Sequence, residues 1–387
     1  MRALQPPAEA RRDAFLADLR DLVDIDSGSH SPAGVNAVVD RLEARFRAGG
    51  WTSERTANPG TPYGDLLVST LDGGAGTRIL VIGHTDTVFD DGTVAERPFT
   101  ITGDRATGPG VNDMKGGVLL AMHAIETLVE TGTPFGRITF VCNPDEEVGS
   151  PSSHDVIARL AEDTDVALVF EAAREDGSCV SARKGVSDFE VDVIGRAAHA
   201  GVEPERGRSA IVEAAHRAIA LHGLNGRWPG VTVNVGTVSG GTRPNVVPAE
   251  ARMVIDLRSP TAEVQREAED AIEEVLRTTV DPDVRIEFVR RTWHRPMEKN
   301  EGVARLADLA RDVAADLGFA HRDAATGGGS DACTTAAMGV PTLDGLGPVG
   351  GDPHSVKEWM DVPSVPSRIA LAAGLIARAG EAVTRAS

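Results

Sequence analysis

The order of its strand and helix patterns constrains this chain more than any other feature. Helices are predicted at residues 12–23 and 36–50, where apolar residues recur at three- and four-residue spacing, and at 116–130. Four short apolar runs bounded by turn residues predict strands at 66–71, 78–83, 138–142 and 166–170. This alternation predicts an α/β fold with a mixed, mostly parallel sheet covered by helices on both faces.

From about residue 185 the pattern changes. Strands at 188–194, 231–238, 251–257 and 284–289, with helices at 209–222 and 261–279, give the ferredoxin-like order β-α-β-β-α-β. The first pattern then resumes with helices at 302–317 and 362–379. We therefore predict a larger domain in two parts, residues 1–184 and 296–387, with a ferredoxin-like domain at 185–295 inserted into it.

The length and charge of the chain fit this division and exclude some partners. The chain has 387 residues, whereas a single hydrophobic core stops growing at about 250 to 300 residues. Its 39 basic and 58 acidic residues give a net charge of −19, which is not the basic footprint of a nucleic-acid-binding protein. We expect neither nucleic acid nor a membrane surface as a partner.

The cysteines favour a reducing compartment. Cys142, Cys179 and Cys333 are odd in number and far apart in sequence, which suits neither a disulfide framework nor a cysteine-based zinc site. The first 24 residues lack the apolar core of a signal peptide, and no apolar run of 18 residues follows. We expect a cytoplasmic protein.

Histidine and acidic residues gather near the carboxyl ends of the predicted strands, the edge at which open α/β sheets bind ligands. They are His84, Asp86, Asp113, Glu146, Glu147, Glu171 and His354. Taken singly, each is more often a solvated charge or a surface histidine. Together, two histidines and several carboxylates form a ligand set that borderline divalent metals such as zinc accept.

Glu146 and Glu147 are expected to have different roles. Adjacent side chains that leave a strand point to opposite sides, so the two carboxylates cannot both bind one ion in the same way. One can bind the metal while the other faces the water that the metal activates, which is the position of a general base. Asp86 can accept a hydrogen bond from the second ring nitrogen of His84 and so fix its tautomer.

A series of motifs resembles one enzyme family. In sequence order they are HTDTV, GPGVNDMKGG, NPDEEVGS, FEAA, AAHAG, RPNVVPAEA and TGGGSDA. Together they resemble the dinuclear-zinc M20 metallopeptidases, and most of all the glutamate carboxypeptidase (carboxypeptidase G2) branch. The resemblance covers nearly the whole chain after about Gly64. It implies that the larger domain is catalytic and that the inserted domain is a lid and dimerisation domain.

The resemblance also implies a ligand set for two zinc ions per chain, with Co²⁺ or Mn²⁺ as substitutes. Asp113 would bridge the two ions. His84 and Glu171 would complete one site, and Glu147 and His354 would complete the other.

Three further residues are implied as catalytic. Glu146 would be the general base, and Asp86 would support His84. His199, in AAHAG, would come from a partner subunit and lie over the scissile carbonyl. The family also places a cis peptide bond after the bridging residue, here between Asp113 and Met114.

The resemblance assigns substrate contacts as well. Asn245 and Arg258 match positions that bind the free α-carboxylate of the substrate, and Arg295 would bind a second anionic group. Gly328 and Gly329, in TGGGSDA, would also contact the substrate. For Arg258 the alternative is a surface salt bridge, because a guanidinium fork also suits any nearby Asp.

The expected function is zinc-dependent hydrolysis of an amide or peptide bond that releases a C-terminal amino acid with a free carboxylate. The alternative is an N-acyl-amino-acid amidohydrolase, such as an aminoacylase or deacetylase, with the same chemistry and ligands. A third reading is a non-catalytic carboxylate-binding relative, because fold does not guarantee function. The expected partners are a small peptide or N-acyl amino acid as substrate and a second copy of the chain, joined through the lid.

Overall fold

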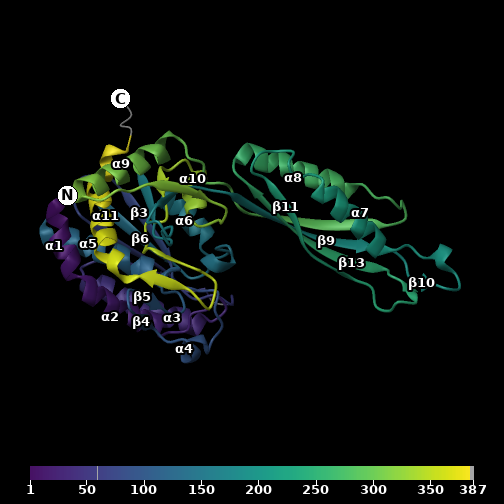
Figure 1. Ribbon diagram of the computed structural model, residues 1–387, viewed down its shortest axis with the longest axis horizontal. Helices are drawn as coiled ribbons and strands as arrows, with labels where there is room; N and C mark the ends of the chain where they lie inside the picture. Colours follow the sequence, from purple (N-terminus) through teal and green to yellow (C-terminus); the bar gives the residue numbers. More distant parts are fainter. Residues whose placement is uncertain (59, 384–387) are drawn as a thin grey trace. The chain divides into compact units, whose positions relative to one another are not determined.

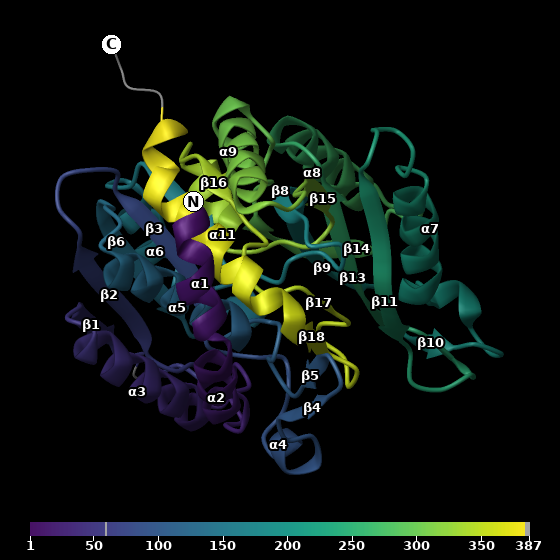
Figure 2. The same ribbon diagram turned by 60° about the vertical axis from the view of Figure 1, so that its left-hand side comes forward.

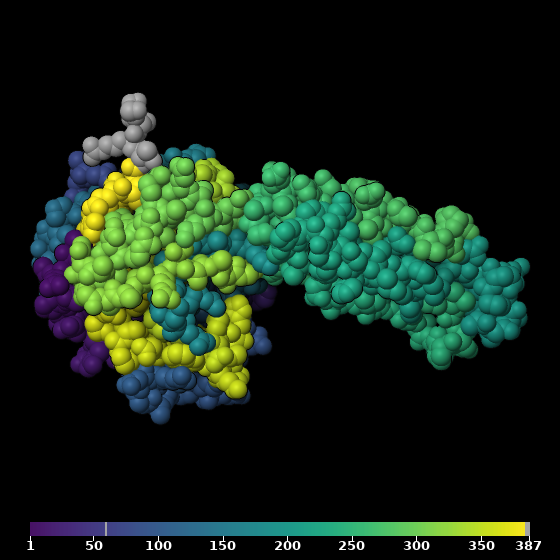
Figure 3. All heavy atoms as spheres, turned by 45° about the horizontal axis from the view of Figure 1, so that its top comes forward, coloured from purple at the N-terminus to yellow at the C-terminus, as the bar shows by residue number. Residues whose placement is uncertain are grey.

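The chain, described by a computed structural model over residues 1–58 and 60–383, divides into two compact units (Figure 1). The first unit comprises Met1–Ala182, Lys299–Thr326 and Ser330–Ser387, and the second comprises Arg183–Glu298 and Gly327–Gly329. Figure 3 shows the purple N-terminal and yellow C-terminal parts of the chain in one body. The short glycine segment Gly327–Gly329 groups with the second unit, whereas the sequence prediction placed it in the larger domain.

A six-stranded sheet forms the centre of the first unit, in the order β1-β2-β6-β3-β7-β16. Its strands are β1 (Thr52–Thr56), β2 (Leu66–Asp72), β3 (Ile79–His84), β6 (Arg137–Asn143), β7 (Val166–Val169) and β16 (Thr342–Leu343). β6, β3, β7 and β16 pair in parallel, whereas β1 and β2 join the edge antiparallel. The predicted mixed, mostly parallel sheet is confirmed.

Helices cover this sheet because its central strands are apolar on both faces. β3 and β7 are buried along their whole length, as expected for parallel strands between two helical layers. The helices of the unit are α1 (Gln5–Ala10), α2 (Arg12–Val23), α3 (Pro32–Ala48), α4 (Thr93–Glu96), α5 (Lys115–Thr131), α6 (His154–Ala161), α9 (Glu301–Leu317), α10 (Ala332–Ala337) and α11 (Val365–Arg378). α5 is buried over most of its surface, between β3 and α11.

Two small sheets complete the first unit (Figure 2). One has the order β17-β18-β5-β4, and the other pairs β15 with β8. The strands are β4 (Thr100–Thr102), β5 (Arg105–Thr107), β8 (Cys179–Arg183), β15 (Asp323–Thr326), β17 (Gly350–Gly351) and β18 (Trp359–Asp361). The pairing of β18 with β5 matters for the site, because the loop that carries Asp113 begins directly after β5.

The second unit is a four-stranded antiparallel sheet with two helices, in the spatial order β11-β13-β9-β14. Its main elements are β9 (Gly185–Ile194), α7 (Ala210–His222), β11 (Thr232–Gly240), β13 (Glu250–Ser259), α8 (Ala262–Arg277) and β14 (Arg285–His294). The predicted ferredoxin-like order is confirmed. Alternate residues of β13 and β9 are buried with α7 and α8, so the helices cover one face of the sheet.

Local sequence explains where the helices of this unit begin. Ser209 and Thr261 precede α7 and α8, and each side chain accepts a hydrogen bond from a backbone N–H of the first turn. Such caps contribute about 1 kcal/mol each. A short ribbon of β10 (Ala198–His199) with β12 (Val246–Val247) lies at one end of the unit.

Two further observations concern the predicted environment of the chain. Cys142, Cys179 and Cys333 are buried and free of disulfides. Among the described residues, no helix combines the length and the apolar character needed to cross a membrane.

Candidate metal centre

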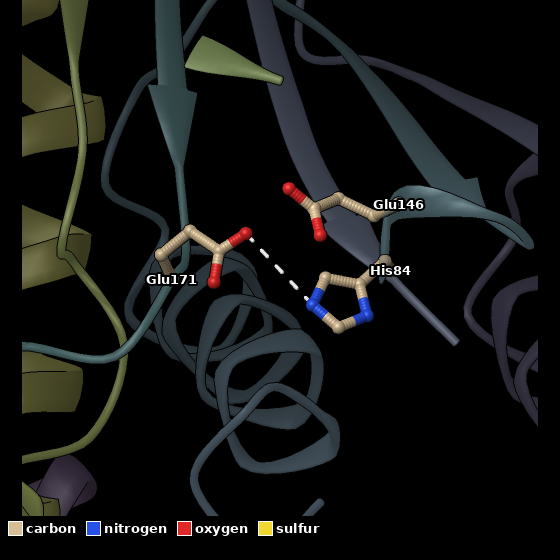
Figure 4. A group of neighbouring side chains, drawn as sticks. All are labelled: His84, Glu146 and Glu171. Atoms are coloured by element: carbon tan, nitrogen blue, oxygen red, sulfur yellow. Dashed lines mark ion pairs between the residues drawn. The ribbon is translucent and has the colours of Figure 1, made fainter. Parts of the chain in front are cut away.

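His84 is the centre of a cluster of acidic side chains in the first unit. It is the last residue of β3 and is 1 % exposed. Its Nε2 lies 3.1 Å from Oδ1 of Asp113 and 3.8 Å from Oε1 of Glu171, which follows β7 (Figure 4). Because β3 and β7 are parallel neighbours, their carboxyl ends bring these two side chains together.

Asp113 lies between two histidines. Its Oδ1 faces His84, and its Oδ2 lies 3.3 Å from Nε2 of His354. The same nitrogen of His354 lies 3.0 Å from Oε2 of Glu147. The Asp113–Met114 peptide bond is cis, as the family resemblance implied. One carboxylate thus joins two groups of potential ligands.

Glu146 and Glu147 diverge, although they occupy a 3-10 turn (Glu146–Val148) and not the end of a strand. Potential ligand atoms of His84, Glu146 and Glu171 all lie within 4.8 Å of one another, and so do those of His84, Asp113 and Glu147. Figure 4 shows the Glu146 carboxylate beside His84 and across from Glu171. The turn therefore sends the two neighbouring carboxylates to different groups.

Asp86 connects His84 to this turn. Nδ1 of His84 lies 2.9 Å from the backbone oxygen of Asp86 and 3.3 Å from its carboxylate, so the carbonyl is the nearer acceptor. The Asp86 carboxylate accepts the backbone N–H groups of Glu146 and Glu147 at 3.2 and 3.1 Å, and the hydroxyl of Ser29 at 2.7 Å. Asp86 thus fixes the ring of His84, a predicted metal ligand, and the backbone of Glu146 and Glu147.

The side chain of Asp331 also holds the segments on either side of the acidic turn, a contact that was not predicted from the sequence. Its carboxylate accepts hydrogen bonds from the side chains of Asn143 and Ser150, which flank the acidic turn. All three residues are buried. The only available signal was the position of Asp331 in the TGGGSDA motif, which indicates nothing about its partners.

Burial and mutual repulsion perturb the carboxylates of this cluster. Burial, with the charge of Glu171 nearby, raises the pKa of Glu146 well above its usual value. Burial also raises the pKa of Glu147. A group of buried acids with raised pKa values is an environment that a cation would stabilise.

The acidic neighbours also perturb the two histidines. Burial alone would lower the pKa of His84, but hydrogen bonds with Asp113 and Asp86 outweigh it and raise the pKa. Hydrogen bonds with Asp113 and Glu147 raise the pKa of His354 to about 10. Imidazole and carboxylate donors grouped in this way fit zinc and similar divalent metals.

The predicted catalytic residue His199 and the predicted substrate-binding residues lie in the second unit. His199 and Asn245 are exposed and close in the fold, because β10 pairs with β12 and the Ala200 N–H donates to the Asn245 carbonyl at 3.0 Å. The Nδ1 of His199 accepts a hydrogen bond from the Gly201 N–H. Gly328 and Gly329 accept hydrogen bonds through their carbonyls from Nη1 of Arg183.

Both predicted anion-binding arginines have carboxylate partners within the second unit. Nε of Arg258 donates to both oxygens of Asp256 at 2.8 and 3.1 Å, and Nη2 lies 2.8 Å from Oδ1. This is the salt bridge that the sequence analysis gave as the alternative to substrate binding by Arg258. Arg295 donates through Nη1 to Glu269, which is buried.

Comparison with known proteins identifies the family. Residues 80–378 match the family model described as peptidase family M20/M25/M40. The chain is also 32% identical over 376 residues to carboxypeptidase G2 from a Pseudomonas species, which covers 95% of this chain and 90% of that protein. The chain belongs to the M20 peptidase family. It is therefore a hydrolytic enzyme of the metallopeptidase and amidohydrolase type that acts on amide C–N bonds.

Other similar proteins differ in the substrates that their names state. Acetylornithine deacetylase from Myxococcus xanthus is 29% identical over 297 residues, which covers 72% of this chain and 76% of that protein. The fold of a tripeptidase from Staphylococcus aureus matches with a TM-score of 0.80 at 22% identity, over 95% of this chain and 99% of that one. Membership of the M20 family, whose metallopeptidases use metal ions, thus establishes a hydrolytic enzyme and leaves the substrate open.

Proposed function

We propose that this M20 enzyme is a zinc-dependent carboxypeptidase of the glutamate carboxypeptidase type. It would release a C-terminal amino acid with a free carboxylate from a peptide or an N-acyl conjugate. The similarity to carboxypeptidase G2 supports the carboxypeptidase part of the proposal. The observation that carries the metal-dependent part is the position of Asp113, whose two carboxylate oxygens face His84 and His354 separately. That arrangement supports two metal ions per chain, with His84 and Glu171 on one side and Glu147 and His354 on the other.

Glu146 has the properties of the general base in this proposal. When bound, two zinc ions, or Co²⁺ or Mn²⁺ in their place, would polarise the scissile carbonyl and lower the pKa of the attacking water. Glu146 accepts a proton from that water as the new C–O bond forms. It then delivers the proton to the amine nitrogen as the C–N bond breaks. Its carboxylate lies beside His84 and Glu171, where a water held by the metal could reach it.

The second unit would supply orientation and specificity. His199 and Asn245 are exposed polar side chains on adjoining segments, and His199 would donate a hydrogen bond to the oxyanion. Asp256 occupies Nε and Nη2 of Arg258, which leaves Nη1 for the free carboxylate of the substrate. Arg295 would have to exchange Glu269 for a second anionic group of the substrate, so a preference for acidic side chains depends on that exchange.

The Arg258 assignment predicts a preference for free-acid substrates. Asp256 stays paired with Arg258, so amidation of the C-terminal carboxylate would remove only the charge-assisted hydrogen bond to Nη1. Such a bond contributes about 1.5 to 3 kcal/mol, and its loss should lower kcat/KM about 10- to 150-fold. Arg258→Ala should lower kcat/KM on the free acid to a similar extent and leave the poor amide substrate nearly unchanged. Steady-state kinetics on matched free-acid and amidated dipeptides measures both effects.

Arg252 provides the matched control for this experiment. It lies on the same strand, is exposed and pairs with Glu190, so Arg252→Ala should alter neither rate. Equal efficiency of the wild-type enzyme on free-acid and amidated substrates would count against the carboxypeptidase proposal and favour an amidase that recognises the acyl side.

An N-acyl-amino-acid amidohydrolase is the second candidate, and the similarity to an acetylornithine deacetylase favours it. The metal centre and the general base would be the same in both cases. Rates on N-acetyl, N-benzoyl and dipeptide substrates with varied C-terminal residues distinguish the two, because a deacetylase prefers the small acyl group. The cytoplasmic location stays a prediction, which rests on the small number and wide spacing of the cysteines in the sequence.

We also propose a homodimer formed through the second unit. β11 lies at the edge of its sheet, and α7 exposes Ile211, Val212 and Ile219 beside it. An unpaired strand edge next to exposed apolar side chains is a surface that a two-fold partner can cover. In this dimer His199 serves the neighbouring active site.

Mixing two inactive variants tests the shared site. His199→Ala chains combined with Glu146→Gln chains form heterodimers with one intact site, so about a quarter of wild-type activity should return after random exchange. The control is a chain that carries both substitutions, which should stay inactive in mixtures with either single variant. Absence of recovery, with subunit exchange verified by mass spectrometry, would show that His199 does not serve a neighbouring site.

A further inference from the structure

Glu358 is a buried carboxylate that binds the loop carrying Asp113. Its side chain is almost fully buried, at 1 % exposed. Oε1 accepts the backbone N–H groups of Asn112 and Asp113 at 2.8 and 3.0 Å, and Oε2 accepts that of Gly110 at 3.0 Å. Three donors from one short loop therefore converge on a single carboxylate.

The fold places Glu358 opposite this loop. β18 begins at the next residue, and its pairing with β5 joins Trp359 to Thr107, just before the loop starts. Gly110 has a φ of 76°, and a Cβ there would lie 2.8 Å from the Thr87 side chain, so the tight turn requires glycine. Strand pairing thus fixes the start of the loop, and Gly110 allows its turn. Glu358 then binds the backbone of the loop between Gly110 and Asp113.

A carboxylate suits this position better than any neutral side chain. Backbone N–H groups that converge on one point form an anion-binding concavity, and hydrogen bonds to a charged acceptor are about twice as strong as neutral ones. Glutamine at 358 keeps one acceptor oxygen, but its amide NH₂ would face one of the three N–H donors. A donor facing a donor in a buried site costs about 1 to 3 kcal/mol.

We propose that Glu358 is a positioning residue of the metal centre, which holds the loop of Gly110 to Asp113 so that Asp113 faces both histidines. The proposal rests on the proposed function, in which Asp113 bridges two metal ions. Glu358 contacts the Asp113 backbone and not its carboxylate, so it acts through the loop. The chain segment that provides His354 also provides Glu358, and it therefore determines the position of two ligands.

Zinc affinity measured by competition with a chromogenic chelator tests this role. Outer partners of metal ligands typically contribute 10- to 100-fold to metal affinity, so Glu358→Gln should weaken zinc binding by about that factor. Glu213 is the matched control. It is also buried, and it accepts the backbone N–H groups of Val280 and Asp281 in the second unit. Glu213→Gln should lower thermal stability without changing zinc affinity.

Unchanged zinc affinity in folded Glu358→Gln overturns the proposal. If that variant does not fold, Glu358→Asp replaces it, because the shorter side chain keeps the charge but withdraws the acceptors. It should also bind zinc more weakly, and wild-type affinity in Glu358→Asp equally overturns the proposal.

Hydrogen exchange of the metal-free wild-type enzyme provides a readout independent of metal. The amides of residues 110, 112 and 113 should exchange slowly, because they donate to a buried carboxylate. Fast exchange at these amides overturns the positioning role. If these amides exchange slowly but the wild-type chain binds no zinc, the contact between Glu358 and the loop is supported and the proposed metal centre is contradicted. The experiment therefore distinguishes failure of the positioning role from failure of the proposed function.

Discussion

Glu146→Gln should lower turnover about a hundred- to ten-thousand-fold, which is the range for general acid–base catalysis. Glutamine keeps the size and the acceptor oxygen of Glu146 but cannot take a proton from water. The side chain lies beside His84 and across from Glu171, so it is placed to act on a water held at the same group. Substrate KM should change little, because the substitution removes a proton transfer and not a substrate contact.

Metal content decides between the two roles open to Glu146. Potential ligand atoms of Glu146, His84 and Glu171 lie within 4.8 Å of one another, so geometry alone also allows Glu146 to bind a metal. We expect Glu146→Gln to keep about two ions per chain, measured by atomic emission. The neighbouring substitution Glu147→Gln provides the contrast and should lose metal together with activity. Loss of metal from Glu146→Gln and its retention in Glu147→Gln would reverse the two assignments.

Long periodic elements were the most predictable part of the fold. The predicted helix at 12–23 matches α2 (Arg12–Val23), because its apolar residues recur at helical spacing. β1 was missed, because Thr52–Thr56 has the sequence TSERT and alternates between exposed and half-buried positions without an apolar side chain. Short strands such as β18, at three residues, are too short for any periodicity to appear.

The proximity of the predicted metal ligands could be predicted from the sequence, because the carboxyl ends of parallel strands lie at one edge of the sheet. His84 ends β3 and Glu171 follows the neighbouring parallel strand β7, so that Nε2 of His84 lies 3.8 Å from Oε1 of Glu171. The divergence of Glu146 and Glu147 was predicted from strand geometry, but a 3-10 turn produces it. The prediction of different directions therefore agrees with the structure for a different physical reason.

Contacts between distant segments were not predictable. Glu358 and Gly110 are 248 residues apart in sequence, and the pairing of β18 with β5 brings their segments together. The Asp256 partner of Arg258 lies two residues earlier, on the same face of β13. The sequence analysis allowed a salt bridge of Arg258 as an alternative, but only the side-chain geometry shows that the bridge forms.

Removal of metal should lower turnover about a thousand-fold or more, the equivalent of several kcal/mol of transition-state stabilisation. Without a cation, buried carboxylates remain in a site where burial raises the pKa values of Glu146 and Glu147. The proton acceptor would then lack the polarised water on which it acts. Magnesium should restore little, because it prefers oxygen ligands and retains its waters, whereas this site includes two histidines.

The most direct test of the metal-dependent mechanism is a zinc titration of the chelator-treated enzyme. Release of a C-terminal amino acid from a dipeptide is followed at each addition, with bound metal counted in the same samples. We predict that turnover is lost with the metal and returns in proportion to zinc, up to two ions per chain. Full turnover in protein shown to be free of metal would contradict the account.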